Sequence, residues 1–285
     1  SPFNSRDGQF ITSRQIKERI EKELETNVGM RLELGTVGEF IVSGRGELHL
    51  SILIETMRRE GYEFQVAKPE VIIKQIDGVT CEPYEEIIID IPEEYIGSVT
   101  EELGKRKAEM KNMQTENGMS RLTYEIPTRA LFGMRNILLT ATRGTAIFNT
   151  MLVGFKPLGE KLPQLRNGVL ISDRMGDTLT YGLNVAQGRG KTFVGPGVEV
   201  YEGMIIGENS RAEDIDINVC KGKNLTNMRS STADLVVALE PPVQKSLEQF
   251  LDFIEADEYL EVTPKSLRLR KKYLTAIERK KHRND

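Results

Sequence analysis

The first seventy residues alternate between helical and strand-like spacing of apolar positions. Thr12 and Gln15 form the Thr-x-x-Gln pattern of a capping box, and apolar residues recur at every fourth position after it. This spacing predicts a helix that ends near Asn27. Alternating runs then predict short strands, and a second amphipathic helix is expected to stop at Gly61. These later elements are expected at residues 30–34, 38–43, 46–60 and 62–66.

The order helix, strand, strand, helix, strand is that of a ferredoxin-like unit without its first strand. We expect the first strand upstream of Ser1, or formed in part around Phe3. A linker over residues 74–83, with Asp77-Gly78 as a turn, follows.

The pattern then recurs in full, as strand, helix, strand, strand, helix, strand. Its elements are expected at residues 86–91, 95–108, 111–115, 122–126, 129–142 and 146–155. The predicted fold class is therefore α+β, with two tandem ferredoxin-like βαββαβ modules over residues 1–74 and 75–158.

The last part, residues 159–285, has short apolar runs separated by glycine-rich turns. This spacing predicts a mainly β, barrel-like domain with one helix over residues 243–254. A final strand over residues 266–271 is expected to place leucines on one face and Arg268 and Arg270 on the other. The remaining strands are expected at residues 169–172, 178–183, 192–194, 198–201, 204–207, 215–220 and 235–239.

Composition restricts the possible functions. The net charge of the 285 residues is −4, so a nucleic-acid surface must be a local patch. Cys81 and Cys220 are far apart, which argues for a reducing compartment, and we expect the cytoplasm. No apolar run approaches membrane-spanning length, so no membrane contact is expected. With two histidines and no Cys/His cluster, no metal site is expected.

One polar segment, residues 220–231, has the composition of a loop that binds phosphate and sugar. It contains cations, amides and hydroxyls around a mobile glycine and has no carboxylate. Its candidate RNA-binding residues are Lys221, Lys223, Asn224, Asn227 and Arg229. A solvated polar connection is the alternative interpretation.

Other cationic groups allow two interpretations each. The tail over residues 265–283 is strongly basic, which is typical of a solvated or disordered end but also of a polyanion contact. Its candidate RNA-binding residues are Arg268, Arg270, Lys271 and Lys272. In the second module, cations near the carboxyl end of a helix are explained either by their interaction with the helix dipole or by contact with ribosomal RNA. These possible RNA-facing residues are Lys105, Arg106, Lys107 and Arg143.

Catalytic motifs are not found. Residues 187–192 resemble a phosphate-binding loop, but Val185 stands where a Walker A motif needs glycine, and no strand-to-helix setting is predicted. A basic turn is the favoured interpretation, and a phosphorylated ligand there is the weakest hypothesis. His49 is expected to have a structural role near a helix start, and Glu47 to act as a cap.

Several motifs resemble parts of translational GTPases. Residues 43–50, Ser-Gly-Arg-Gly-Glu-Leu-His-Leu, resemble a signature of the third domain of elongation-factor-G-like proteins. The second module is similar to their fifth domain, at residues 82–85, 91–99, 132–135 and 141–144. The last part is similar to the C-terminal domain of the BipA/TypA family, at residues 167–172, 199–207, 223–229 and 261–264. The chain is identified as the C-terminal half of a BipA/TypA family member.

This resemblance implies a function for the chain. The family is a bacterial ribosome-associated GTPase with links to large-subunit assembly, low temperature and stress. GTP and Mg²⁺ would bind in missing N-terminal domains, so this part would need no cofactor and would have no catalytic activity. Its expected partners are the 70S ribosome, ribosomal RNA, the acceptor arm of an A-site transfer RNA, and the upstream GTPase domains. The alternative is a protein-interaction module that relays nucleotide state between those domains and ribosomal proteins.

Overall fold

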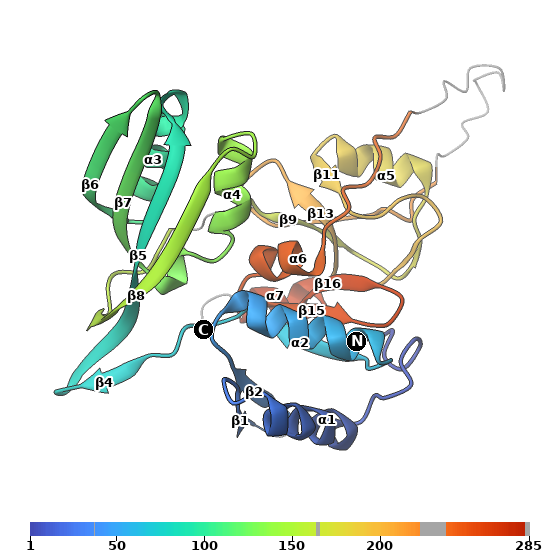
Figure 1. The fold of residues 1–285 in the computed structure, drawn as a ribbon. Helices are drawn as coiled ribbons and strands as arrows, with labels where there is room; N and C mark the ends of the chain where they lie inside the picture. The colour runs from blue at the N-terminus through green and yellow to red at the C-terminus, as the bar shows by residue number, and fades with distance from the viewer. Residues whose placement is uncertain (37, 164–165, 223–237, 283–285) are drawn as a thin grey trace. The chain divides into compact units, whose positions relative to one another are not determined.

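The computed structural model describes residues 1–36, 38–163, 166–222 and 238–282. The chain forms two compact units (Figure 1). Unit 1 combines Ser1–Lys68 with Arg166–Asp285, and unit 2 is Pro69–Leu165. The first and the last of the three predicted regions thus pack together, whereas the division into three domains stays a prediction.

Unit 2 is a complete ferredoxin-like module, as predicted. Its strands lie in the order β6-β7-β5-β8 with antiparallel neighbours, and α3 and α4 cover one face of the sheet (Figure 1). The elements are β5 (Val79–Pro92), η1 (Glu93–Tyr95), α3 (Ile96–Lys105), β6 (Glu109–Glu116), β7 (Met119–Pro127), η2 (Thr128–Ala130), α4 (Met134–Ala141) and β8 (Ile147–Pro157).

The core of unit 2 follows from the alternation in its central strand. Ile87, Ile89 and Ile91 of β5 are fully buried, and they pack against Val99 of α3 and Leu138 of α4. Because side chains of a strand alternate between faces, one face of the sheet carries this core. Strict period-2 alternation is the reason that the module was predictable from sequence.

The predicted linker over residues 74–83 is wrong, although its turn is correct. Strand β4 (Lys74–Ile76) pairs with the start of β5 through a two-residue turn at Asp77 and Gly78. Both turn residues have positive φ, 50° and 79°, which suits the right-handed twist of a hairpin. The segment is therefore a β-hairpin that extends the sheet of unit 2.

Unit 1 is built on an open mixed sheet, and a closed barrel is not found among its described strands. The sheet runs in the order β14-β9-β13-β16-β15-β3, with β11 paired to β13 beside it. The strands are β3 (Phe64–Ala67), β9 (Val169–Ser172), β11 (Gly190–Thr192), β13 (Met204–Asn209), β14 (Ile215–Ile217), β15 (Glu258–Val262) and β16 (Leu267–Lys271). A separate pair consists of β10 (Gly176–Asp177) and β12 (Glu199–Val200).

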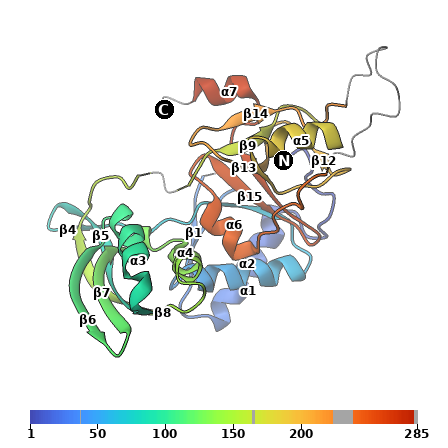
Figure 2. The same ribbon diagram turned by 90° about the horizontal axis from the view of Figure 1, so that it is seen from above.

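Both faces of this sheet are buried, which explains why a barrel was expected. Val169 and Ile171 of β9 face one core with α6, whereas Leu170 between them faces a second core with α5. Figure 2 shows α5 and α6 on opposite sides of β9 and β13. Continuous apolar runs are typical of strands covered on both faces, and helices provide that cover here.

Three helices, not one, lie in the described part of residues 166–282. They are α5 (Thr180–Gln187), α6 (Leu247–Phe253) and α7 (Ala276–Lys281). The first occupies a predicted strand, and the second is shorter than predicted because Ser246 and Gln249 form a capping box that starts it. The described part of the basic tail contains β16 and α7, and α7 begins with a capping box of Thr275 and Glu278.

The first predicted module does not form its own ferredoxin-like sheet. Strands β1 (Arg31–Leu34) and β2 (Phe40–Ser43) pair only with each other. Strand β3 pairs instead with β15, in the register Phe64↔Val262 to Ala67↔Tyr259. The two helices, α1 (Ser13–Thr26) and α2 (Glu47–Arg59), match the prediction, and the capping box of Thr12 and Gln15 is present.

Phe3 contributes to a core and not to a strand, so the alternative that the missing strand forms in part around this residue is wrong. It is 3% exposed and meets Tyr201 edge to face, with ring centroids 4.8 Å apart. The adjacent backbone is fixed by Glu63, whose carboxylate accepts hydrogen bonds from the N–H groups of Ser5, Asp7 and Gly8. The first residues are thus an integral part of unit 1.

Candidate nucleic-acid interface

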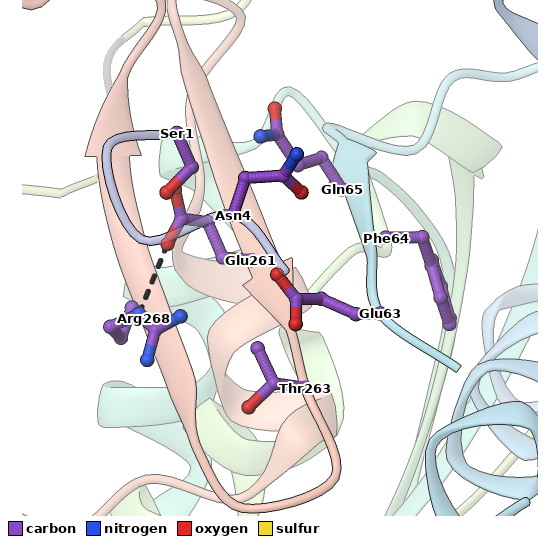
Figure 3. Close-up of a pocket in the computed structure, with 8 residues that line it drawn as sticks. All are labelled: Ser1, Asn4, Glu63, Phe64, Gln65, Glu261, Thr263 and Arg268. Atoms are coloured by element: carbon purple, nitrogen blue, oxygen red, sulfur yellow. Dashed lines mark hydrogen bonds and ion pairs between the residues drawn. The ribbon is translucent and has the colours of Figure 1, made fainter. Parts of the chain in front are cut away.

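The strand β16 does not offer the cationic face that its sequence predicts. Arg268 donates from Nε to Glu261 of β15 at 3.0 Å, and its side chain is 13% exposed. It lines a small pocket formed by the first residues of the chain and the paired strands β3, β15 and β16, and Figure 3 shows its ion pair with Glu261 there. Its guanidinium also stands 5.3 Å from the ring centre of Phe3. These contacts give Arg268 a structural role within unit 1.

Arg270 and Lys271 are also in the interior. Arg270 donates to Gln65 of β3, and its guanidinium stacks 4.9 Å from the ring of Tyr259. Lys271 is 2% exposed and forms an ion pair with the fully buried Glu258, with 2.8 Å between Nζ and Oε1. The burial of these two cations disfavours their predicted contact with RNA.

The electrostatics of Lys271 agree with this internal role. Burial by itself lowers the pKa of its ammonium, but the carboxylates of Glu258, Asp214 and Asp257 outweigh it and raise that pKa above its usual value. Nζ lies 2.6 Å from Asp214 and 2.9 Å from Asp257. Because a buried charge needs such partners, loss of one carboxylate is costly to the fold.

The exposed cations of the tail lie at other positions. Lys272, the residue after β16, is exposed. In α7, Lys280 and Lys281 are exposed, whereas Arg279 is held by Asp216 and by the carbonyl oxygen of Tyr273. Of the four predicted tail residues, only Lys272 is accessible to a polyanion.

The predicted RNA-binding loop begins at the amino end of α5. Lys221 and Gly222 are exposed and closely follow Val219, whose carbonyl oxygen accepts a hydrogen bond from the N–H of Leu179, the N-cap residue of α5. At the other end of α5, the Gln187 side chain donates to the Glu240 carbonyl at 2.8 Å and accepts from the Glu240 N–H at 3.0 Å. Lys223, Asn224, Asn227 and Arg229 lie outside the described residues.

In unit 2, the predicted cationic cluster separates into buried and exposed members. Arg106 is 3% exposed and donates to the carbonyl oxygens of Ala130 and Phe132, so it ties the end of α3 to the start of α4. The ammonium of Lys105 forms ion pairs with glutamates one turn earlier in α3. Arg106 therefore acts within the unit, and Lys105 remains at its surface.

Lys107 and Arg143 share an unusual backbone conformation. Both have left-handed φ angles, 59° and 51°, directly after helices α3 and α4. Both are exposed, and Lys107 forms an ion pair with Glu160. Glycine is favoured at such helix ends, so long cations there are not explained by the backbone alone.

The segment that resembles a phosphate-binding loop, residues 187–192, contains two exposed cations. Arg189 and Lys191 follow the carboxyl end of α5, and Lys191 stands opposite Glu208 in the pairing of β11 with β13. The segment runs from a helix into a strand, which confirms that a strand-to-helix setting is missing. A helix carboxyl end repels phosphate, so the geometry favours the basic turn over a phosphate site.

The two residues at the start of α2 differ in outcome. His49 has the predicted structural position, because its Nδ1 accepts from the Arg45 N–H at 3.2 Å and its Nε2 is 2.8 Å from Asn27 Nδ2. Glu47, the first residue of α2, has a carboxyl group with a perturbed pKa. Burial, with Asp252 and Glu248 of α6 nearby, raises the pKa of its carboxyl to about 9.

The described part of the chain contains neither a membrane-spanning helix nor a cluster of metal ligands. None of its helices is long and apolar enough to span a membrane. Within the same residues, no group of three or more His, Cys, Asp or Glu side chains is arranged to hold a metal ion.

Comparison with known proteins adds the family. A family model described as the TypA/BipA C-terminal domain matches residues 167–276, and one described as the elongation factor G C-terminus matches residues 79–166. The chain belongs to the BipA/TypA family. It corresponds to the C-terminal portion of the family's members, and the family's GTPase domain is not in this chain.

Curated relatives match almost all of the chain. It is 50% identical to a protein of Synechocystis sp. over 95% of its own length, 49% identical to one of Bacillus subtilis over 99%, and 48% identical to one of Escherichia coli K12 over 99%. Each is named large ribosomal subunit assembly factor BipA. The chain spans about half the length of these relatives, 46% to 47%.

Proposed function

We propose that this chain is the ribosome- and RNA-binding portion of a bacterial translational GTPase that acts in assembly of the large ribosomal subunit. The relatives' shared name, at 48% to 50% identity over nearly the whole chain, supports this proposal. We further infer that the factor serves in translation and in adaptation to cold and stress, and that GTP and Mg²⁺ bind in domains upstream of this portion.

The proposal rests on the predicted RNA-binding loop, residues 220–231, which we call the loop on α5. Its first cation, Lys221, is exposed, and the backbone on both sides of the loop is tied to α5, at Leu179 and at Gln187. The eight residues of α5 span about 12 Å at 1.5 Å per residue, so the loop leaves and rejoins unit 1 within a short distance. The loop's composition, with three cations and no carboxylate, favours contact with the RNA backbone.

This contact would be largely independent of base sequence. Lysine and arginine neutralise phosphates, whereas asparagine and hydroxyl groups hydrogen-bond riboses and phosphates. We propose ribosomal RNA and the acceptor arm of an A-site transfer RNA as the ligands. Lys107, Arg143 and Lys272 are exposed and make suitable additional contacts to ribosomal RNA.

The test is binding to 70S ribosomes and to deacylated transfer RNA across a salt series. The variant Lys221→Ala/Lys223→Ala/Arg229→Ala is expected to reduce the slope of log affinity against log salt by roughly two to three, because each phosphate contact contributes about 0.7 to 0.9. A matched control, Arg14→Ala/Lys17→Ala/Lys22→Ala on the exposed face of α1, removes the same charge and should keep the parental slope.

Two results would count against the proposal. Equal slopes for the loop variant and the parent would make the loop a solvated connection. Binding of the parent that does not depend on salt would favour the protein-interaction module, in which this portion relays nucleotide state to ribosomal proteins.

A further inference from the structure

The chain passes between the two compact units at two places. It leaves unit 1 after Lys68 and returns to it at Arg166. Both of these residues contact one short segment of unit 1, residues 255–258, which joins α6 to β15. We call this segment the 255–258 turn.

The first crossing is held by an accessible ion pair. Lys68 follows β3 directly, and its Nζ lies 2.6 Å from Oε2 of Glu255. Their side chains are 34% and 30% exposed. Such a pair contributes little to overall stability, since water competes for both charges. Its effect is to fix the place where the chain leaves the sheet.

The second crossing is held by a buried group. The guanidinium of Arg166 donates from a terminal nitrogen to Oε1 of the fully buried Glu258 at 2.5 Å, and it stacks 4.5 Å from the ring centre of Phe253. Its Nε is buried and lacks a hydrogen-bond partner, and it faces Oε1 of Glu255 at 3.8 Å. One carboxylate, that of Glu255, therefore serves both crossings.

The turn itself is closed by its own hydrogen bonds. The backbone N–H of Glu255 donates to Oε2 of Glu258 at 3.0 Å, and the N–H of Glu258 donates to the carbonyl of Glu255 at 3.0 Å. Tyr259, the next residue, pairs with Ala67, which directly precedes Lys68. A displacement of Glu255 therefore reaches both crossings through direct contacts.

We propose that the 255–258 turn is a clamp that couples the two crossings, with Glu255 as the residue that joins them. If the contact between Lys68 and Glu255 opens, the carboxylate of Glu255 is released and the support of Arg166 weakens with it. The clamp is independent of RNA binding, because every group in it lies within unit 1 and none belongs to the loop on α5.

The segment that leads from unit 2 back to Arg166 is also held at its other end, within unit 2. Glu82 is fully buried, accepts from Arg129 and also accepts from the backbone N–H of Gly159 at 2.9 Å. A buried glutamate paired with an arginine thus stands at each end of the connection, Glu258 with Arg166 and Glu82 with Arg129. This agrees with a function that requires the crossing points to be fixed.

The test is hydrogen–deuterium exchange of the full chain, read in backbone amides around residues 64–68 and 166–168. Glu255→Gln is expected to speed exchange roughly two-fold to five-fold in both segments, which corresponds to the loss of a half-exposed ion pair. Glu21→Gln is the matched control, because it removes another accessible ion pair of unit 1, the one with Lys17 in α1, and touches neither crossing. It should leave both segments at the parental rate.

The variant Lys68→Met tests whether the two crossings are coupled. It removes a partly exposed cation at the first crossing only, so the fold is retained even if Glu255→Gln destabilises unit 1 more widely. Faster exchange at residues 166–168 in Lys68→Met supports the clamp. Faster exchange confined to residues 64–68 overturns it, as does a Glu255→Gln variant that exchanges like Glu21→Gln.

Discussion

Arg268 and Glu261 face each other across β16 and β15 with 3.0 Å between Nε and Oε2, and only 3% of the glutamate side chain is exposed. The same carboxylate accepts from the hydroxyl of Tyr201 at 2.7 Å and lies 3.3 Å from Arg270. A residue that the sequence offers as an RNA contact is thus part of a buried polar network. Removal of one member of such a network lowers stability, because it leaves buried polar groups without hydrogen-bond partners.

Arg268→Ala should therefore act on stability. We expect it to lower the free energy of unfolding by about 3 kcal/mol, because it leaves Glu261 buried without its main cation. Lys265→Ala is the control: that side chain is 74% exposed, and its loss should cost less than about 0.5 kcal/mol. Urea unfolding measures both. A loss of transfer-RNA affinity by Arg268→Ala without any loss of stability would contradict the structural role.

Phe3→Ala should show that the first residues belong to unit 1. Phe3 is 3% exposed against Tyr201, and truncation of a buried phenylalanine costs about 3 to 4 kcal/mol. Ile277→Ala removes an apolar side chain that is 82% exposed and should have almost no effect. Thermal unfolding followed by calorimetry makes the comparison, and equal midpoints for the two variants would refute this packing.

Glu47 should make unit 1 less stable as the pH rises. Its pKa is raised to about 9 by burial and by Asp252 and Glu248, so the folded state binds a proton that the unfolded state has released above a pKa of 4.5. The stabilisation is complete below pH 4.5 and is lost as the pH rises towards 9.

Urea midpoints at pH 5 and pH 8.5 measure this effect. Glu47→Gln, which keeps a hydrogen-bonding group without the titration, should flatten the fall in midpoint between the two pH values. Glu33→Gln replaces an exposed glutamate of β1 and should leave the fall unchanged. An equally steep fall in the Glu47→Gln variant would assign the pH dependence to other groups.

Arg143→Gly should separate stability from binding. Arg143 has a left-handed φ of 51°, so glycine should be tolerated or should stabilise unit 2 by up to about 1 kcal/mol. If Arg143 contacts ribosomal RNA, the same change should weaken ribosome binding and lower the salt slope by about one.

Asn117→Gly is the control for that comparison. It changes another left-handed position of unit 2, with φ of 52°, and removes no charge. Ribosome pelleting across a salt series, together with thermal unfolding, reads both properties. Unchanged binding by Arg143→Gly would remove this residue from the proposed interface.

The sequence by itself determined the elements whose signals are local. The capping box at Thr12 and Gln15, the turn at Asp77 and Gly78, and the alternating strand over residues 86–91 depend on neighbours a few positions away. The ferredoxin-like elements of unit 2 were predictable for this reason, since consecutive elements of such a module pack against each other, whereas the hairpin strand β4 was missed. The family was likewise readable from short motifs.

Only the tertiary structure decided which faces are covered. Strand β16 alternates leucine with arginine, yet β3, β15 and the first residues of the chain bury both of its faces. The pairing of Phe64 with Val262 joins residues almost two hundred positions apart, and no local pattern specifies such a partner. Charge in a sequence shows that a cation is present. Whether it faces RNA or a buried carboxylate depends on long-range packing, because burial is a property of the assembled neighbours and not of the residue.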